Sequence, residues 1–114
     1  MSDLEQQIRA AATRLSTSPV FREDLWLTLY LAGQPEDLAD VAGQLSADGW
    51  INVDGSESGF IYPKKLARNH DEDIVDLALR TSELCRRHAV ELLTIDADTN
   101  PEVDRSKFVT LFQA

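Results

Sequence analysis

Alternating hydrophobic and polar positions identify residues 25–31 as the clearest strand of the chain. Their order, Leu-Trp-Leu-Thr-Leu-Tyr-Leu, places four leucines on one face and Trp26, Thr28 and Tyr30 on the other. A strand with one apolar face must bury that face against a second layer. We therefore expect the leucines to pack beneath helices and the aromatic rings to lie on the opposite side of a sheet.

Three segments have the apolar spacing of amphipathic helices. The first lies within residues 1–18 and ends where small hydroxyl residues are followed by a proline. The second begins at Pro35 and stops at Gly49, because glycine enters the left-handed conformation at little steric cost. The third is the longest; Asn69 and Asp71 are alternative caps for it, and its charges match the helix dipole at both ends.

Three further strands complete the order strand, helix, strand, strand, helix, strand. Residues 50–53 and 60–62 flank a loop rich in turn-forming residues and should pair as a hairpin. Pro63 lacks the amide proton of a ladder, so the pairing should weaken there. Residues 90–95 form the last strand. The order predicts an α+β, ferredoxin-like sandwich in which a four-stranded antiparallel sheet carries two helices on one face.

The chain of 114 residues has room for one domain. Residues 1–18 are expected to be a helix that packs on this domain, and residues 19–114 are expected to be the ferredoxin-like domain with a C-terminal extension. Within that extension, residues 107–112 suit either a helix or an extended segment. The open face of the sheet is either free or covered by the N-terminal helix or by this tail.

Charge narrows the choice of partners. Eleven basic and twenty acidic residues give a formal net charge of −9, a field that repels nucleic-acid phosphates and anionic membranes and attracts a basic protein surface. Solubility is the plainer reason for such a charge. The single cysteine, Cys85, cannot form an internal disulfide, and no apolar run is long enough to span a bilayer. These features favour a cytoplasmic protein that contacts neither nucleic acid nor membrane.

One segment has metal-ligand spacing. Asp96, Asp98 and Asn100 are spaced like the first ligands of a calcium loop, but Pro101 stands where that loop needs glycine and Lys107 where it needs glutamate. An acidic turn after a strand explains the segment better. We therefore expect neither a metal nor another cofactor.

No group of residues predicts catalysis. Cys85 and His88 are spaced to share a helix face, but a nucleophile also needs an orienting group and an oxyanion pocket. Lys64, Lys65 and Arg68 form the one basic cluster, which fits a solvated connection between a strand and the last helix better than its alternative, an anion-binding edge. The chain is therefore expected not to be an enzyme.

In several local patterns the chain resembles the regulator of ribonuclease activity B family, whose members are ribonuclease E inhibitors. The resemblance covers roughly residues 26–96 and consists of the strand at residues 26–31, the helix start at Glu36, Asp37 and Leu38, the step at Asp48, Gly49 and Trp50, and the long helix with an acidic start. It implies a ferredoxin-like acidic protein that binds a ribonuclease. The chain lacks the strongly acidic tail and the aromatic-rich last strand associated with that family.

Together these features predict a non-enzymatic acidic regulatory protein that binds and modulates a protein partner with a basic surface, a ribonuclease being one candidate. The predicted contact residues are Trp26, Thr28, Tyr30, Trp50 and Tyr62. Tryptophan and tyrosine suit this role because they bury a large area with limited loss of side-chain entropy. The alternatives are a small-molecule-sensing or dimerisation domain, which would form a homodimer, and an immunity protein that neutralises a toxin.

Overall fold

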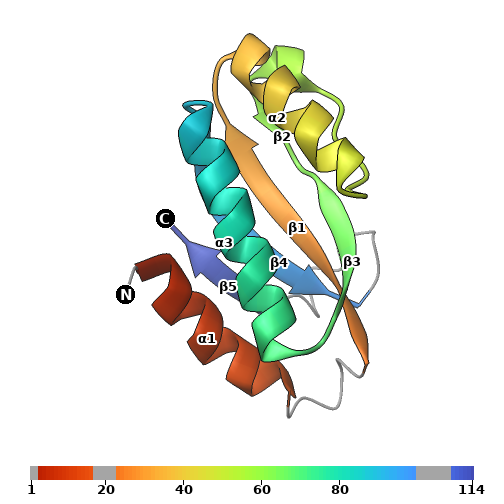
Figure 1. Cartoon of the computed structure of the whole chain (residues 1–114), viewed down its shortest axis with the longest axis vertical. Helices are drawn as coiled ribbons and strands as arrows, with labels where there is room; N and C mark the ends of the chain where they lie inside the picture. The colour runs from red at the N-terminus through yellow and green to blue at the C-terminus, as the bar shows by residue number, and fades with distance from the viewer. Residues whose placement is uncertain (1–2, 17–22, 100–108) are drawn as a thin grey trace.

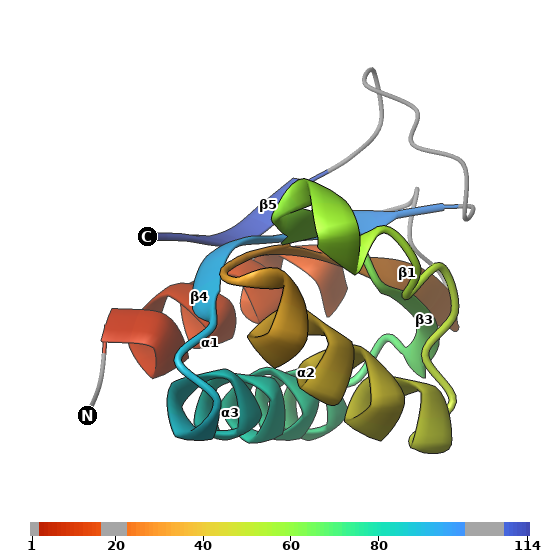
Figure 2. The same cartoon turned by 90° about the horizontal axis from the view of Figure 1, so that it is seen from above.

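Three α-helices lie on one side of a five-stranded antiparallel sheet (Figures 1 and 2). The structure is a computed structural model that describes residues 3–16, 23–99 and 109–114. The elements, in chain order, are α1 (Asp3–Ser16), β1 (Asp24–Ala32), α2 (Pro35–Ala47), the short 3-10 helix η1 (Ser56–Ser58), β2 (Phe60–Ile61), β3 (Lys64–Arg68), α3 (Asp71–Arg87), β4 (Glu91–Asp98) and β5 (Val109–Gln113). The predicted α+β class is therefore confirmed.

The first strand lies inside the sheet, as its alternation predicted. β1 pairs with β2 and β3 along one edge and with β4 along the other, and β5 pairs with the far edge of β4. Its four leucines are at most 2% exposed and form the centre of the core. The helices cover this leucine face, and no α-helix of the described chain lies on the other face (Figure 2).

The strands between α2 and α3 differ from the prediction. Residues 50–53 form no strand; only an isolated bridge joins Ile51 to Lys64. The basic segment predicted as a connection is instead strand β3, which pairs with β1 from Thr28 to Asp24. Pro63 does not end this pairing, because the amide of Leu29 donates a hydrogen bond of 2.9 Å to its carbonyl oxygen. A proline blocks only donation, and here its carbonyl accepts.

α2 and α3 both begin with acidic residues, as the helix dipole favours, but neither has a side chain that caps its first turn with a hydrogen bond. α2 begins at Pro35 as predicted, and Gly49, just beyond its end, has φ of 91°. α3 begins after His70, so neither Asn69 nor Asp71 is its cap. The side chain of Asn69 instead donates a hydrogen bond of 3.1 Å to the carbonyl oxygen of Leu15 and so ties this turn to α1. The predicted end of the first helix at residues 17–19 lies outside the described residues.

The C-terminal segment adds an edge strand, which the four-stranded prediction lacked. β5 pairs with β4, and its Leu111 is 2% exposed, while α1 packs against α3 and β5 on the helical side. Neither α1 nor β5, which is the described part of the tail, covers the open face. Asp96 and Asp98, predicted in a turn, belong to β4. Residues 100–108, which include Asn100, Pro101 and Lys107, lie outside the described chain.

Candidate protein-binding surface

The face of the sheet opposite the helices, called the open face here, is built from rows of directly paired residues. In one row, Lys64 of β3 faces Thr28 of β1, and Thr28 faces Asp96 of β4. In the next row, Leu66 faces Trp26, and Trp26 faces Asp98. Directly paired residues of antiparallel strands project to the same side of a sheet. The open face is therefore acidic over β4, and over β1 and β3 it carries the apolar Trp26 and Leu66 next to the polar pair of Thr28 and Lys64.

The four large hydrophobic side chains that are exposed in the described chain all belong to the β1 to β3 side of this face. We call them the exposed apolar patch: Ile51, Phe60, Tyr62 and Leu66, each 46 to 49% exposed. Ile51 shares the side of Lys64 through its bridge, and Phe60 shares the side of Ala32. Large exposed apolar side chains gathered on one face are typical of interaction surfaces in soluble proteins.

Two tyrosines of this face contact each other. The rings of Tyr30 and Tyr62 meet edge to face, with centroids 5.5 Å apart and planes at 89°. This is a favoured geometry for aromatic pairs, because the positive edge of one ring meets the negative face of the other. Tyr30 is half-buried while Tyr62 is exposed, so the pair presents one rigid ring to solvent.

A polar group lies beside the patch. Lys64 Nζ donates a hydrogen bond of 3.1 Å to Thr28 Oγ1, and burial lowers the pKa of Lys64, an effect that the nearby Asp98 and Asp96 oppose. Asp96 is 5% exposed and Asp98 is 2% exposed. Among the described residues, Asp96 Oδ1 has no hydrogen-bond partner. The acidic part of the open face is therefore made of two almost fully covered carboxylates, one of which has an unpaired oxygen.

The structure brings together four of the five predicted contact residues. Trp26, Thr28 and Tyr30 share the open face, and Tyr62 joins them through its contact with Tyr30. Trp50 is the exception: it is 4% exposed and lies in the core beneath α3, beside the leucines of β1. Its indole therefore belongs to the helical side and not to the open face.

Sequence reasoning missed the members of this surface that depend on β3. Leu66 and Lys64 were assigned to a connection, and Ile51 was assigned to a hairpin with the wrong partner strand. The order Lys-Lys-Leu-Ala-Arg shows no hydrophobic alternation, because its two apolar residues are adjacent. Burial alternates only in the folded sheet, where Ala67 is buried between exposed Leu66 and exposed Arg68. The segment itself therefore gives little strand signal, and the preceding proline also disfavours a strand.

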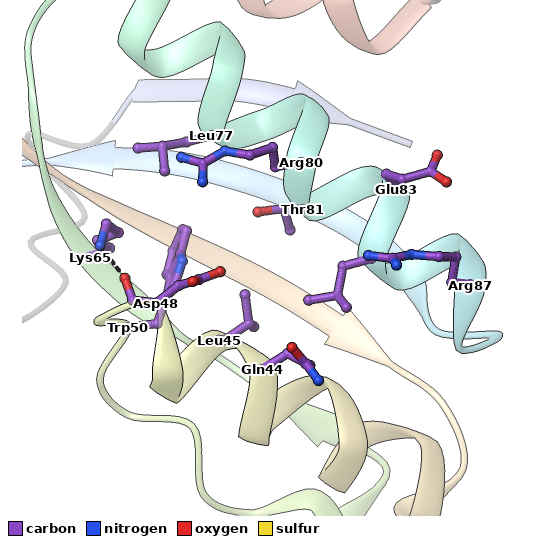
Figure 3. A pocket seen from close by; sticks show the side chains of 11 residues that line it. Gln44, Leu45, Asp48, Trp50, Lys65, Leu77, Arg80, Thr81, Glu83 and Arg87 are labelled. Atoms are coloured by element: carbon purple, nitrogen blue, oxygen red, sulfur yellow. Dashed lines mark hydrogen bonds between the residues drawn. The ribbon is translucent and has the colours of Figure 1, made fainter.

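A second hollow lies between α2 and α3, on the helical side (Figure 3). Its volume is about 290 Å³. Leu45 and Trp50 line its floor, while Lys65, Arg80 and Arg87 stand around it. We call it the interhelical groove.

The candidate thiol is placed for packing and not for chemistry. Cys85 is 2% exposed, and burial raises the pKa of its thiol to about 12. A thiol with such a pKa carries almost no thiolate at neutral pH, and the thiolate is the reactive form. His88 follows the last residue of α3, where it occupies the C-cap position.

Searches for external relationships gave no match. Within the described residues, no set of three or more His, Cys, Asp or Glu side chains could hold a metal ion, and no helix there is long and apolar enough to cross a membrane. No family model, no curated protein and no solved structure matched the chain.

Proposed function

We propose that the chain is a non-enzymatic regulator that binds a basic protein through its open face. The observation that carries the proposal is the position of the exposed apolar patch on the same sheet face as the acidic residues of β4, a face that no described α-helix covers. Protein interfaces combine aromatic anchors with polar groups at their margin. The patch supplies the anchors, and Asp96 and Asp98 supply the charge.

Electrostatics support a basic partner. The net charge of −9 attracts a positive surface over a longer range than any contact. At closer range, the carboxylates of Asp96 and Asp98 lie almost fully covered on the β4 side of the open face, where their negative charge adds to that attraction. On the β3 side, the positive charge of Lys64, which donates a hydrogen bond to Thr28, limits how far the negative potential of these carboxylates extends.

The finer fold assignment is also a proposal. The spatial order runs from the bridge at Ile51 through β3 and β1 to β4, and α2 and α3 connect these segments in the β-α-β-β-α-β order. This order supports a ferredoxin-like core in which the strand at Ile51 is reduced to a bridge and β5 is an added edge strand. The resemblance to ribonuclease E inhibitors rests on the same core, so a ribonuclease is our candidate target.

The proposal is tested by capture followed by measurement with purified partner. The immobilised chain is incubated with extract of its own cells at low and high salt, and proteins released by salt are identified and purified. Their affinity is then measured for the wild type and for the double variant Tyr62→Ser, Leu66→Ser. We expect the double variant to bind at least about tenfold more weakly, a loss of about 1.4 kcal/mol or more.

The matched control is the double variant Glu83→Ser, Arg86→Ser on α3. These residues form an exposed ion pair on the opposite side of the sheet, so their joint removal leaves the net charge unchanged. Where the captured partner is a ribonuclease, RNA cleavage with and without the chain shows whether binding inhibits it. Equal binding by the wild type and by the Tyr62, Leu66 variant would exclude the open face as the binding surface.

A further inference from the structure

The interhelical groove exists because α2 and α3 are spread apart. α3 packs extensively against α1, whereas α2 and α3 have little direct contact. The space between them is closed from below by Trp50, which is 4% exposed, and by Leu45, which is 2% exposed. The remaining hollow of about 290 Å³ lies near the lower end of the range of about 300 to 1,000 Å³ found for ligand sites.

The charges of the groove oppose those of the whole chain. Lys65, Arg80 and Arg87 line it together with two carboxylates, Asp48 and Glu83, so it is locally positive in a chain of net charge −9. Figure 3 shows Arg80 and Arg87 extending from α3 over the groove, while the carboxylate of Glu83 points away from its centre. Cations gathered over an apolar floor provide what an amphipathic anion needs.

The three cations are not equally engaged. Lys65 Nζ donates a hydrogen bond of 2.5 Å to the carbonyl oxygen of Asp48, which fixes it at the end of α2. Arg80 pairs with Asp76 at 3.0 Å on the outer surface of α3. Arg87 forms no ion pair with any residue of the described chain. Its guanidinium is therefore the one most available to a ligand, and it can hold a carboxylate or phosphate with two parallel hydrogen bonds.

We propose that the interhelical groove binds a small organic anion, with its apolar body on Trp50 and Leu45 and its carboxylate or phosphate on Arg87 and Arg80. The site lies on the helical side of the sheet and so is separate from the open face. An apolar body suits the floor, because the floor is formed by the side chains of Trp50 and Leu45. The carboxylate of Asp48 at the far end disfavours a second negative charge on the ligand.

The two tryptophans of the chain give an internal control for the experiment. In a ¹⁵N-labelled sample, the indole N–H signal of Trp50 reports on the groove and that of Trp26 reports on the open face; the variant Trp26→Phe assigns them. The probes are 2-naphthoate and 2-naphthyl phosphate, which distinguish a carboxylate from a phosphate, and the neutral 2-naphthalenemethanol. We expect at least one anion to shift the Trp50 signal saturably, with a dissociation constant below about 1 mM, and the neutral probe to bind at least about tenfold more weakly.

Charge reversal then locates the anion. Arg87→Glu should weaken binding of the anion by at least about tenfold, whereas Arg68→Glu, the same change at an exposed position of β3 that does not line the groove, should change it less than about twofold. Arg80→Gln gives a milder second variant, and the unperturbed spectrum of each protein shows that it is folded. Equal effects of the Arg68 and Arg87 variants, a shift confined to Trp26, or no saturable shift with either anion would overturn the proposal. None of these outcomes bears on protein binding at the open face.

Discussion

At the scale of single residues, Lys64 shows how the open face balances opposing effects. Its ammonium group loses part of its hydration in the sheet, and this loss outweighs the attraction of Asp98 and Asp96, so its pKa falls below the ordinary value of 10.5. The folded chain therefore binds fewer protons than the unfolded chain at pH values between the two pKa values. By linkage, the contribution of Lys64 to stability rises with pH through that window, which ends near 10.5.

Replacing Lys64 tests this sign. Lys64→Met removes the charged group, so the variant should gain most stability over wild type near about pH 8, where the wild-type lysine is charged. This difference in the free energy of unfolding should shrink by about pH 11, where the wild-type lysine is itself neutral. Lys64→Arg, which stays charged throughout, should lose stability relative to wild type over the same range. Urea denaturation at the two pH values measures both differences. A difference between Lys64→Met and wild type that does not change with pH would contradict the lowered pKa.

Cys85 provides a second prediction at this scale. Because burial raises its thiol pKa to about 12, an aromatic disulfide reagent at about pH 8 should label the native protein only as fast as α3 opens. The labelling rate should therefore increase with urea in parallel with unfolding. Ser82→Cys in a Cys85→Ala background places a thiol at a partly exposed position on the same helix and should react much faster. Equal rates for the two thiols would show that Cys85 is accessible in the native state.

At the scale of elements, local pattern and long-range pairing were predictable to different degrees. β1 was predicted because four leucines at alternate positions carry the signal within the strand itself, and α2 because Pro35 and Gly49 mark its ends. β3 was missed because its pairing with β1 depends on residues about forty positions away in sequence. The candidate surface follows the same division: Trp26, Thr28 and Tyr30 lie on β1, whereas Leu66 and Lys64 require the register of β3.

The C-terminal strand gives the prediction for this scale. Leu111 is 2% exposed, so Leu111→Ala should lower the free energy of unfolding by about 2 to 5 kcal/mol, through lost burial and the cavity that remains. The adjacent Thr110 is exposed, and Thr110→Ala should change stability by less than about 0.5 kcal/mol. Urea denaturation followed by circular dichroism measures both. A neutral Leu111→Ala variant would mean that β5 contributes little to the folded domain.

At the scale of the whole molecule, the two sides of the sheet are specialised in opposite ways. The helical side buries the core and carries a locally positive groove, and the open side carries the exposed apolar patch next to buried carboxylates. A net charge of −9 acts on both sides from a distance, yet only the open side offers large exposed hydrophobic groups in the described chain. The long-range attraction due to the net charge and the short-range contacts of the exposed apolar patch should therefore be separable in binding experiments.

This separation leads to a kinetic prediction for the purified partner. Long-range attraction mainly sets the association rate, and buried contacts mainly set the dissociation rate. Raising ionic strength from about 0.05 M to about 0.5 M should therefore slow association of the wild type by about tenfold or more and change its dissociation by less than about threefold. The Tyr62→Ser, Leu66→Ser variant keeps all its charges, so it should associate at nearly the wild-type rate and dissociate at least about tenfold faster. Surface plasmon resonance resolves the two rates. If salt instead accelerated dissociation while the variant slowed association, the acidic residues would be the anchor, and the apolar patch would not be the surface that holds the partner.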